Sequence, residues 1–181
     1  MNNRKVYISG EIVPEVDAKI SIFDSAVLLG DTVTESTRTF NFKPFKLDEH
    51  LERLYKSFKL TRIDPQMTIE EMKKVSLELL EINKDNYKAN EDCWLVHNIS
   101  RGHSITGGNP ALQVSKPTVM IYTQPMNLVL WAPFYTKGCH AVTPPTRMVP
   151  SQSLDARIKN RSRLFYTLAE IEAKLVDPDA Q

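Results

Sequence analysis

The stretch GDTVTESTRTFNFKPFKL, residues 30–47, decides how this chain folds. Its first half is rich in β-branched residues, which predicts a strand over 33–40. Asn41 indicates a turn, and a short second strand is expected over 45–47. The stretch therefore predicts a β-hairpin.

The next residues, DEHLERLYKSFKL, predict a helix over 48–60 that packs on this hairpin. Asp48 is expected to cap its first turn. Four apolar residues spaced i, i+3, i+4 and i+7 form its inward stripe: Leu51, Leu54, Tyr55 and Phe58.

Working outward, the chain alternates irregularly between strands and helices. A hairpin is predicted at 6–13 and a second helix at 68–84, which Thr68 caps and which buries Ile69, Met72, Val75, Leu79 and Ile82. Further strands are predicted at 93–100, at 117–123 and within KGCHAVTPPTR (137–147), and a last helix at 162–176. This order indicates an α+β fold rather than regular β-α alternation.

Composition excludes several classes of protein. The 181 residues carry a formal net charge of +1, which argues against a nucleic-acid or anionic-membrane partner. No apolar run is long enough to span a bilayer and the amino terminus has no signal core, so a cytoplasmic location is expected. The two cysteines are expected to be reduced, and the four histidines show no metal-site spacing.

The proline-bounded segment QPMNLVLWAP indicates a domain boundary. An amino-terminal α+β domain is expected over 1–122, a linker over 123–135 and the beginning of a second domain over 136–181. The last part is too short to build a stable core by itself.

Two positively charged residues are candidates for a chemical role. Lys159 stands ahead of the last helix in SLDARIKNRSRLF, residues 153–165; it is either a solvated charge or an amine that attacks a carbonyl. Arg53 lies off the apolar stripe of its helix with His50 and Ser57. That face is either simply hydrated or able to hold a phosphate.

A resemblance joins these two residues. The motifs GDTVTESTR, EHLERL, RGHS and IKNRSRL follow one another in the order seen in class IV pyridoxal-phosphate aminotransferases, and the match runs through nearly the whole chain. That family includes branched-chain and D-amino acid aminotransferases and aminodeoxychorismate lyases. The resemblance implies a two-domain enzyme of fold type IV, with a complete amino-terminal domain and a truncated carboxy-terminal one.

The resemblance also implies roles for individual residues. Lys159 matches the lysine that forms a Schiff base with pyridoxal 5'-phosphate, and Arg53 matches the arginine that grips the cofactor phosphate. Thr34 falls at a pocket-lining position. Trp94 and Val96 alternate with Leu95, so they share the strand face that the family turns toward the substrate.

The departures from the family pattern leave the substrate open. Branched-chain enzymes have an arginine where Val96 stands, and D-amino acid enzymes have an arginine and a histidine at Thr106 and Gly108. Leu164 stands where branched-chain enzymes have a tyrosine that bonds the cofactor. The family also has roughly a hundred further residues, including a glutamate for the pyridine nitrogen, so the 181 residues are expected to be a fragment, a truncated gene product or one half of a split enzyme.

The expected function is transamination of an amino acid or amine with a 2-oxo acid, by a homodimer in the complete protein and with weak or no activity in these 181 residues alone. Two alternatives remain open. One is an aminodeoxychorismate lyase-type elimination, and the other is a truncated, non-catalytic module of the same fold.

Overall fold

The computed structural model describes residues 3–88, 91–103 and 116–181. The chain forms two compact units. Unit 1 comprises Met1–Met126 and Arg157–Arg161, and unit 2 comprises Asn127–Ala156 and Ser162–Gln181. The predicted domain limits stay a prediction, but the return of Arg157–Arg161 to unit 1 is a feature that no local pattern indicated.

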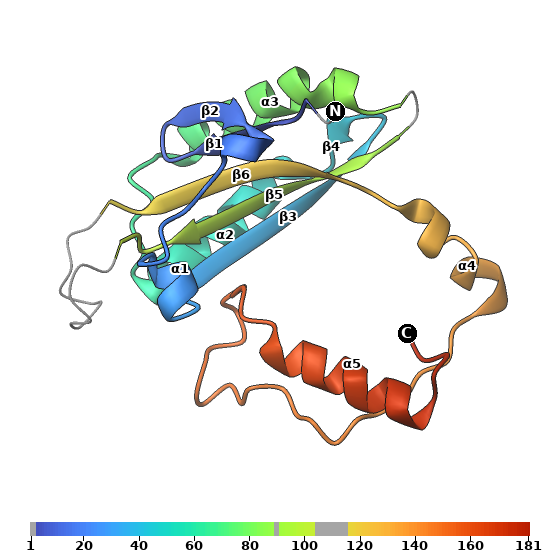
Figure 1. Ribbon diagram of the computed structural model, residues 1–181. Coiled ribbons are helices and arrows are strands. Elements are labelled where there is room, and N and C mark those ends of the chain that lie inside the picture. Colours follow the sequence, from blue (N-terminus) through green and yellow to red (C-terminus); the bar gives the residue numbers. More distant parts are fainter. Residues whose placement is uncertain (1–2, 89–90, 104–115) are drawn as a thin grey trace. The chain divides into compact units, whose positions relative to one another are not determined.

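Unit 1 is built on a six-stranded antiparallel sheet with two long helices on one face (Figure 1). The strand order is β2-β1-β6-β5-β3-β4. The strands are β1 (Lys5–Ile8), β2 (Glu11–Pro14), β3 (Thr32–Phe40), β4 (Lys43–Pro44), β5 (Cys93–Ser100) and β6 (Thr118–Pro125). The helices and turns of this unit are η1 (Glu15–Asp17), α1 (Ser25–Leu28), α2 (Leu47–Thr61), α3 (Ile69–Asn83) and η2 (Lys84–Asn86).

The hairpin of β3 and β4 follows the sequence, except for the length of its turn. Asn41 and Phe42 both have left-handed backbones, with φ of 49° and 62°. This two-residue turn places Lys43 directly opposite Phe40, so the second strand is Lys43–Pro44. The prediction of a strand over 45–47 was wrong because it allowed for a longer turn.

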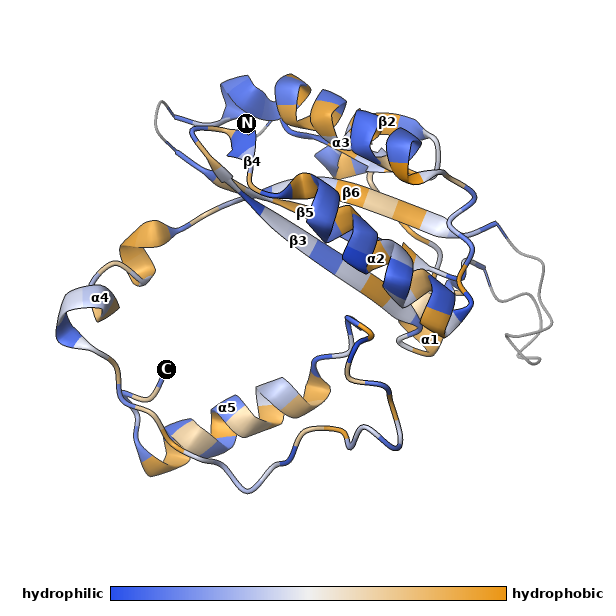
Figure 2. Ribbon diagram, turned by 180° about the vertical axis from the view of Figure 1, so that it is seen from behind, coloured by the Kyte–Doolittle hydropathy of each residue, from blue (hydrophilic) through white to orange (hydrophobic). Residues whose placement is uncertain are grey.

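The two helices cover the sheet as their apolar stripes predict, and these stripes appear in orange in Figure 2. Leu51, Leu54 and Phe58 of α2 are buried. Asp48 does not cap α2, because Lys46 is the N-cap residue and makes no side-chain cap bond. Asp48 instead lies in the first turn, where its carboxylate pairs with Lys73 at 2.7 Å.

Helix α3 begins with the cap that its sequence predicts. Thr68 and Glu71 form a reciprocal capping box. Leu79 is buried as expected, but Ile82 is 42% exposed and Leu80 is buried instead. The buried stripe of α3 therefore runs one position away from the predicted one at its end.

Buried Asp24 anchors α1 to the ends of two strands. Its carboxylate caps α1 through the amide of Ala26 and accepts hydrogen bonds from the hydroxyls of Ser100 and Thr118. The connection between β2 and β3 is thereby fixed to β5 and β6.

Unit 2 contains η4 (Leu128–Leu130), α4 (Phe134–Lys137) and α5 (Leu164–Val176). The strand predicted within 137–147 is absent from this fully described unit, where His140 and Ala180 form only an isolated bridge. Pro144 and Pro145 lack the amide hydrogens that a ladder needs.

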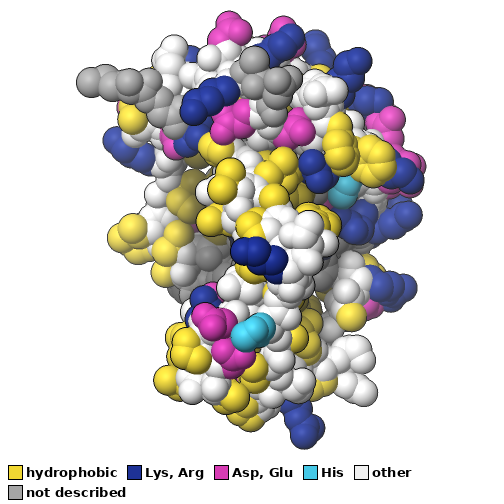
Figure 3. Space-filling model, turned by 90° about the vertical axis from the view of Figure 1, so that its right-hand side faces the viewer, with side chains coloured by type: hydrophobic (Ala, Val, Ile, Leu, Met, Phe, Trp, Pro, Cys, Tyr) yellow, Lys and Arg dark blue, Asp and Glu magenta, His cyan; other side chains and the backbone are white. Residues whose placement is uncertain are grey.

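The last helix is present, and hydrophobic side chains are visible on the surface in Figure 3. The hydrophobic side chains of α5 include Leu164, Leu168, Ile171 and Leu175, which are 46–81% exposed.

None of the helices in the described part of the chain has the length and apolar composition needed to cross a membrane.

Candidate functional site

Lys159 lies beside the first half of β3, on the edge that the short β4 leaves uncovered. The Thr34 amide donates to the Lys159 carbonyl oxygen at 2.8 Å, and the Arg161 amide donates to the Thr32 carbonyl oxygen at 2.9 Å. These bonds form a short antiparallel bridge. The lysine backbone is thus held as an additional neighbour of β3.

The same segment is also bonded to α2. The Lys159 amide donates to Ser57 Oγ at 3.3 Å, and Ser57 is fully buried. Ile158 packs against the hydrophobic core of unit 1. Part of the polar face that carries His50, Arg53 and Ser57 is therefore buried beneath residues 157–161 rather than hydrated.

Arg53 forms a bidentate ion pair with Glu35, which projects from β3 toward α2. Arg53 Nε lies 2.6 Å from Glu35 Oε2, and Nη2 lies 2.7 Å from Oε1. The Glu35 side chain is fully buried, whereas that of Arg53 is 51% exposed. Arg53 Nη1 makes no hydrogen bond to the described residues. Glu35 therefore fixes one edge of the guanidinium and leaves the other edge for a ligand.

Further groups complete the surroundings of Glu35. The Ser36 amide donates to Glu35 Oε1 at 2.8 Å, and His50 Nδ1 lies 3.1 Å from the same oxygen. Burial raises the pKa of the Glu35 carboxyl, but hydrogen bonds from Arg53 and Ser36 and the positive charges of Arg53 and Lys159 outweigh it and hold this pKa below its usual range. The hydrogen bond with Glu35 raises the pKa of Arg53. At neutral pH the site thus holds a carboxylate and a guanidinium.

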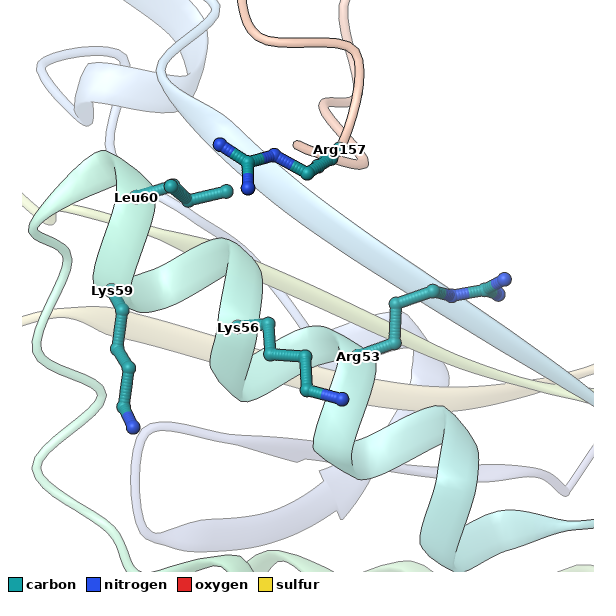
Figure 4. A pocket seen from close by; sticks show the side chains of 5 residues that line it. All are labelled: Arg53, Lys56, Lys59, Leu60 and Arg157. Carbon is teal, nitrogen blue, oxygen red and sulfur yellow. The ribbon is translucent and has the colours of Figure 1, made fainter.

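A pocket of about 560 Å³ opens beside Arg53 (Figure 4). It is lined by Arg53, Lys56, Lys59, Leu60 and Arg157. Figure 4 shows four of these side chains rising from α2 and that of Arg157 coming from the segment that carries Lys159. No carboxylate is among the described lining residues, so the pocket favours an anion.

The three predicted substrate-side residues occupy the opposite face of the sheet. The register pairs Thr34 with Asn98, Ser36 with Val96 and Arg38 with Trp94. Because side chains alternate along a strand, Thr34, Val96 and Trp94 share one face, and Glu35 projects from the other. Thr34 and Val96 are buried and Trp94 is half-buried.

Lys159 therefore stands at a strand edge between two groups of residues. Thr34 connects it to the face that bears Val96 and Trp94, and Ser57 connects it to the helix that bears Arg53. Sequence reasoning missed Glu35. Its i, i+2 spacing from apolar Val33 was the signal that could have found it, because residues two apart on a strand share one face.

Other positions raised by the sequence are not described as part of this arrangement. Thr106 and Gly108 fall outside the described residues. Leu164, which starts α5, and Arg163, which stacks on the Tyr166 ring, belong to unit 2.

Unit 2 also brings His140, Asp177 and Asp179 together, with ligand atoms within 4.8 Å of one another. Both Asp177 oxygens already accept hydrogen bonds within this turn, from the Asp179 amide at 3.0 Å and from His140 at 2.9 Å. These two hydrogen bonds account for the closeness of the three side chains.

Comparison with known proteins gives a consistent result. The family model "Amino-transferase class IV" matches residues 32–180. A putative branched-chain-amino-acid aminotransferase from Methanocaldococcus jannaschii is 35% identical over 175 residues, which cover 97% of this chain and 57% of that protein. A D-alanine aminotransferase from Staphylococcus epidermidis is 32% identical over 120 residues, which cover 66% of this chain and 41% of that protein.

Solved structures share the fold. The branched-chain aminotransferase of the thermophilic archaeon Thermoproteus uzoniensis, solved with norvaline, has a TM-score of 0.75 at 24% identity, covering 96% of this chain and 57% of that one. The branched-chain enzyme of Escherichia coli has a TM-score of 0.80 at 20% identity, covering 97% and 56%. A further branched-chain aminotransferase, solved with pyridoxamine 5'-phosphate, has a TM-score of 0.83 at 24% identity, covering 97% and 57%. The chain therefore spans a little over half the length of several proteins that it matches.

Proposed function

The chain belongs to the class IV aminotransferase family, and from that premise we propose that it serves pyridoxal-phosphate-dependent transamination of an amino acid or amine with a 2-oxo acid. The observation that carries the proposal is the position of Lys159 at the edge of β3, bonded to Thr34 on one side and to Ser57 on the other. A primary amine and a half-exposed guanidinium match the aldehyde and the phosphate of that cofactor. When bound, the cofactor supplies an electron sink.

In this proposal Lys159 has two tasks. Its ε-amine would hold the cofactor at the aldehyde carbon, and, once released by the amino donor, the same amine would take a proton from the substrate carbon and deliver it to that aldehyde carbon. The backbone bonds of Lys159 keep the root of this side chain at one place on the sheet edge.

Arg53 holds the phosphate and thereby fixes the orientation of the cofactor ring. Glu35 positions Arg53 rather than contacting the ligand. With Nε and Nη2 bonded to Glu35, the guanidinium would have Nη1 left to hold the phosphate. Thr34, Val96 and Trp94 line the substrate side of the sheet.

The experiment is cofactor loading followed by borohydride reduction and peptide mapping. Loaded protein should absorb in the visible range, and reduction should fix the label on Lys159. Lys159→Ala should abolish the absorbance, while the matched Lys174→Ala on exposed α5 should retain it. A label on Lys174 would overturn the assignment.

Two further measurements examine the other parts of the proposal. Arg53→Ala removes a charge-assisted contact worth about 1.5–3 kcal/mol, so cofactor affinity should fall at least about tenfold. Lys174→Ala, which removes a cation on exposed α5 outside the pocket lining, is the control. Product analysis separates transamination from the lyase alternative, since the lyase releases pyruvate and an aminobenzoate. Absence of cofactor binding would favour the non-catalytic module.

A further inference from the structure

We propose that Asn98 and Tyr122 form the polar contact that selects the substrate's side chain, and that this side chain carries an uncharged hydrogen-bond donor such as a carboxamide or hydroxyl. This inference rests on the proposed function and extends it to substrate choice. It starts from a buried amide whose hydrogen bonds are incomplete.

Asn98 is buried, and its side-chain oxygen has no hydrogen-bond partner among the described residues. Its Nδ2 donates to the Tyr122 hydroxyl oxygen at 3.0 Å. A buried carbonyl without a partner destabilises a fold, and such groups in native proteins call for a ligand, a water or another explanation.

The strand register places this amide among the proposed substrate-side residues. Asn98 is directly opposite Thr34 on β3, and Tyr122 is directly opposite Val96 on β5. Strand alternation puts all four side chains on the face away from α2 and α3. The Asn98–Tyr122 bond itself confirms that both side chains lie on one face.

This position is also next to the proposed catalytic lysine. Thr34 pairs with Asn98 on one side and donates its amide to the Lys159 carbonyl oxygen on the other. The hydroxyl of Thr34 is engaged with the His97 carbonyl oxygen at 2.9 Å. Among these neighbours, the Asn98 amide therefore offers the unused acceptor.

The available atoms define the ligand chemistry. Asn98 Oδ1 is available to accept a hydrogen bond from a ligand, and the Tyr122 hydroxyl, whose oxygen already accepts from Asn98, keeps its proton to donate. A carboxamide or a hydroxyl satisfies both groups. A carboxylate would face the Asn98 oxygen with a second acceptor, and an aliphatic side chain would leave that oxygen unpaired.

Three nearly isosteric amino acids test this directly: asparagine, aspartate and leucine, each as both enantiomers. With cofactor-loaded protein, kcat/KM as amino donor should be at least about tenfold higher for asparagine than for the other two. In parallel, the Asn98 side-chain amide signal in nitrogen-15 NMR should shift on adding asparagine. This second readout needs no turnover, so it separates failure of the inference from failure of the proposed function.

Variants of the two polar residues sharpen the test. Asn98→Leu should remove the preference for asparagine over leucine and raise the urea midpoint, because it removes an unpaired buried carbonyl. Tyr122→Phe removes only the hydroxyl and should lower the preference severalfold, and it serves if Asn98→Leu does not fold. The control is Thr37→Val, which removes a buried hydroxyl, unpartnered within the described part of the chain, from the opposite face of the sheet and should raise stability without changing the preference.

Three results would overturn the inference. Equal use of the three amino acids would mean that a buried water satisfies Asn98. A preference for aspartate would mean that the amide presents its NH₂ group instead. An Asn98 signal that asparagine leaves unmoved would exclude direct contact.

Discussion

Replacing Arg53 by Ala should expose how strongly the fold depends on the buried Glu35 carboxylate. Two charge-assisted hydrogen bonds of 2.6 and 2.7 Å join the residues. Such bonds contribute about 1.5–3 kcal/mol each when buried. Because the Arg53 side chain is 51% exposed, solvent screening roughly halves this sum, to about 1.5–3 kcal/mol. An exposed ion pair would contribute less than about 1 kcal/mol.

The assay is urea unfolding of four proteins: wild type, Arg53→Ala, Glu35→Gln and the double variant. The interaction energy from this cycle should be about 2 kcal/mol, because the double variant has no unpaired buried carboxylate. Lys56→Ala, which removes a 73% exposed cation from the same helix, should cost no more than about 0.5 kcal/mol.

The pH dependence adds a test of sign. In the wild type the pKa of Glu35 lies below its usual range, so its contribution to stability is lost as pH falls through that pKa. Without Arg53, burial dominates and the pKa of Glu35 rises above its unfolded value. Protonation of Glu35 then removes the unpaired buried charge from the variant. The difference in unfolding free energy between wild type and Arg53→Ala should therefore shrink between about pH 7 and pH 5. A deficit below about 1 kcal/mol that does not change with pH would refute the reasoning.

Three further predictions follow from individual groups. Burial lowers the pKa of His97 to about 4 from 6.5, so the stability of the wild type should fall by up to about 3 kcal/mol as pH drops from 6.5 to 4. His97→Gln should flatten this decline in acid unfolding curves, and an unchanged slope would contradict the prediction. Because Leu168 and Leu175 of α5 are 46% and 81% exposed, replacing both with Glu should reduce self-association in sedimentation experiments. Identical sedimentation of wild type and variant would show that this helix face does not drive self-association. Burial raises the pKa of the Cys93 thiol to about 11, so a thiol reagent should modify exposed Cys139 in the folded protein and Cys93 only after unfolding; rapid labelling of both would show that β5 opens readily.

Local pattern in the sequence determined most elements of unit 1 and the last helix of unit 2. Alternation and β-branched residues predicted β3, β5 and β6, and the 3.6-residue period predicted α2, α3 and α5. These signals succeed because each element must bury one face, which leaves a period in the sequence. The strand predicted within 137–147 is absent from the described unit, because a strand needs a partner to pair with and Pro144 and Pro145 cannot donate to one.

The candidate site required tertiary structure. Sequence pattern proposed Lys159 and Arg53, but only the folded chain attaches residues 157–161 to the free edge of β3 and to Ser57 on α2. Glu35 and Asn98 are ordinary polar residues in the sequence. Their importance arises from burial, since removal from water makes a paired carboxylate stabilising and an unpaired carbonyl costly. Burial and pairing between distant segments are properties of the packed chain, so the sequence determined which residues could act and the fold decided which of them meet.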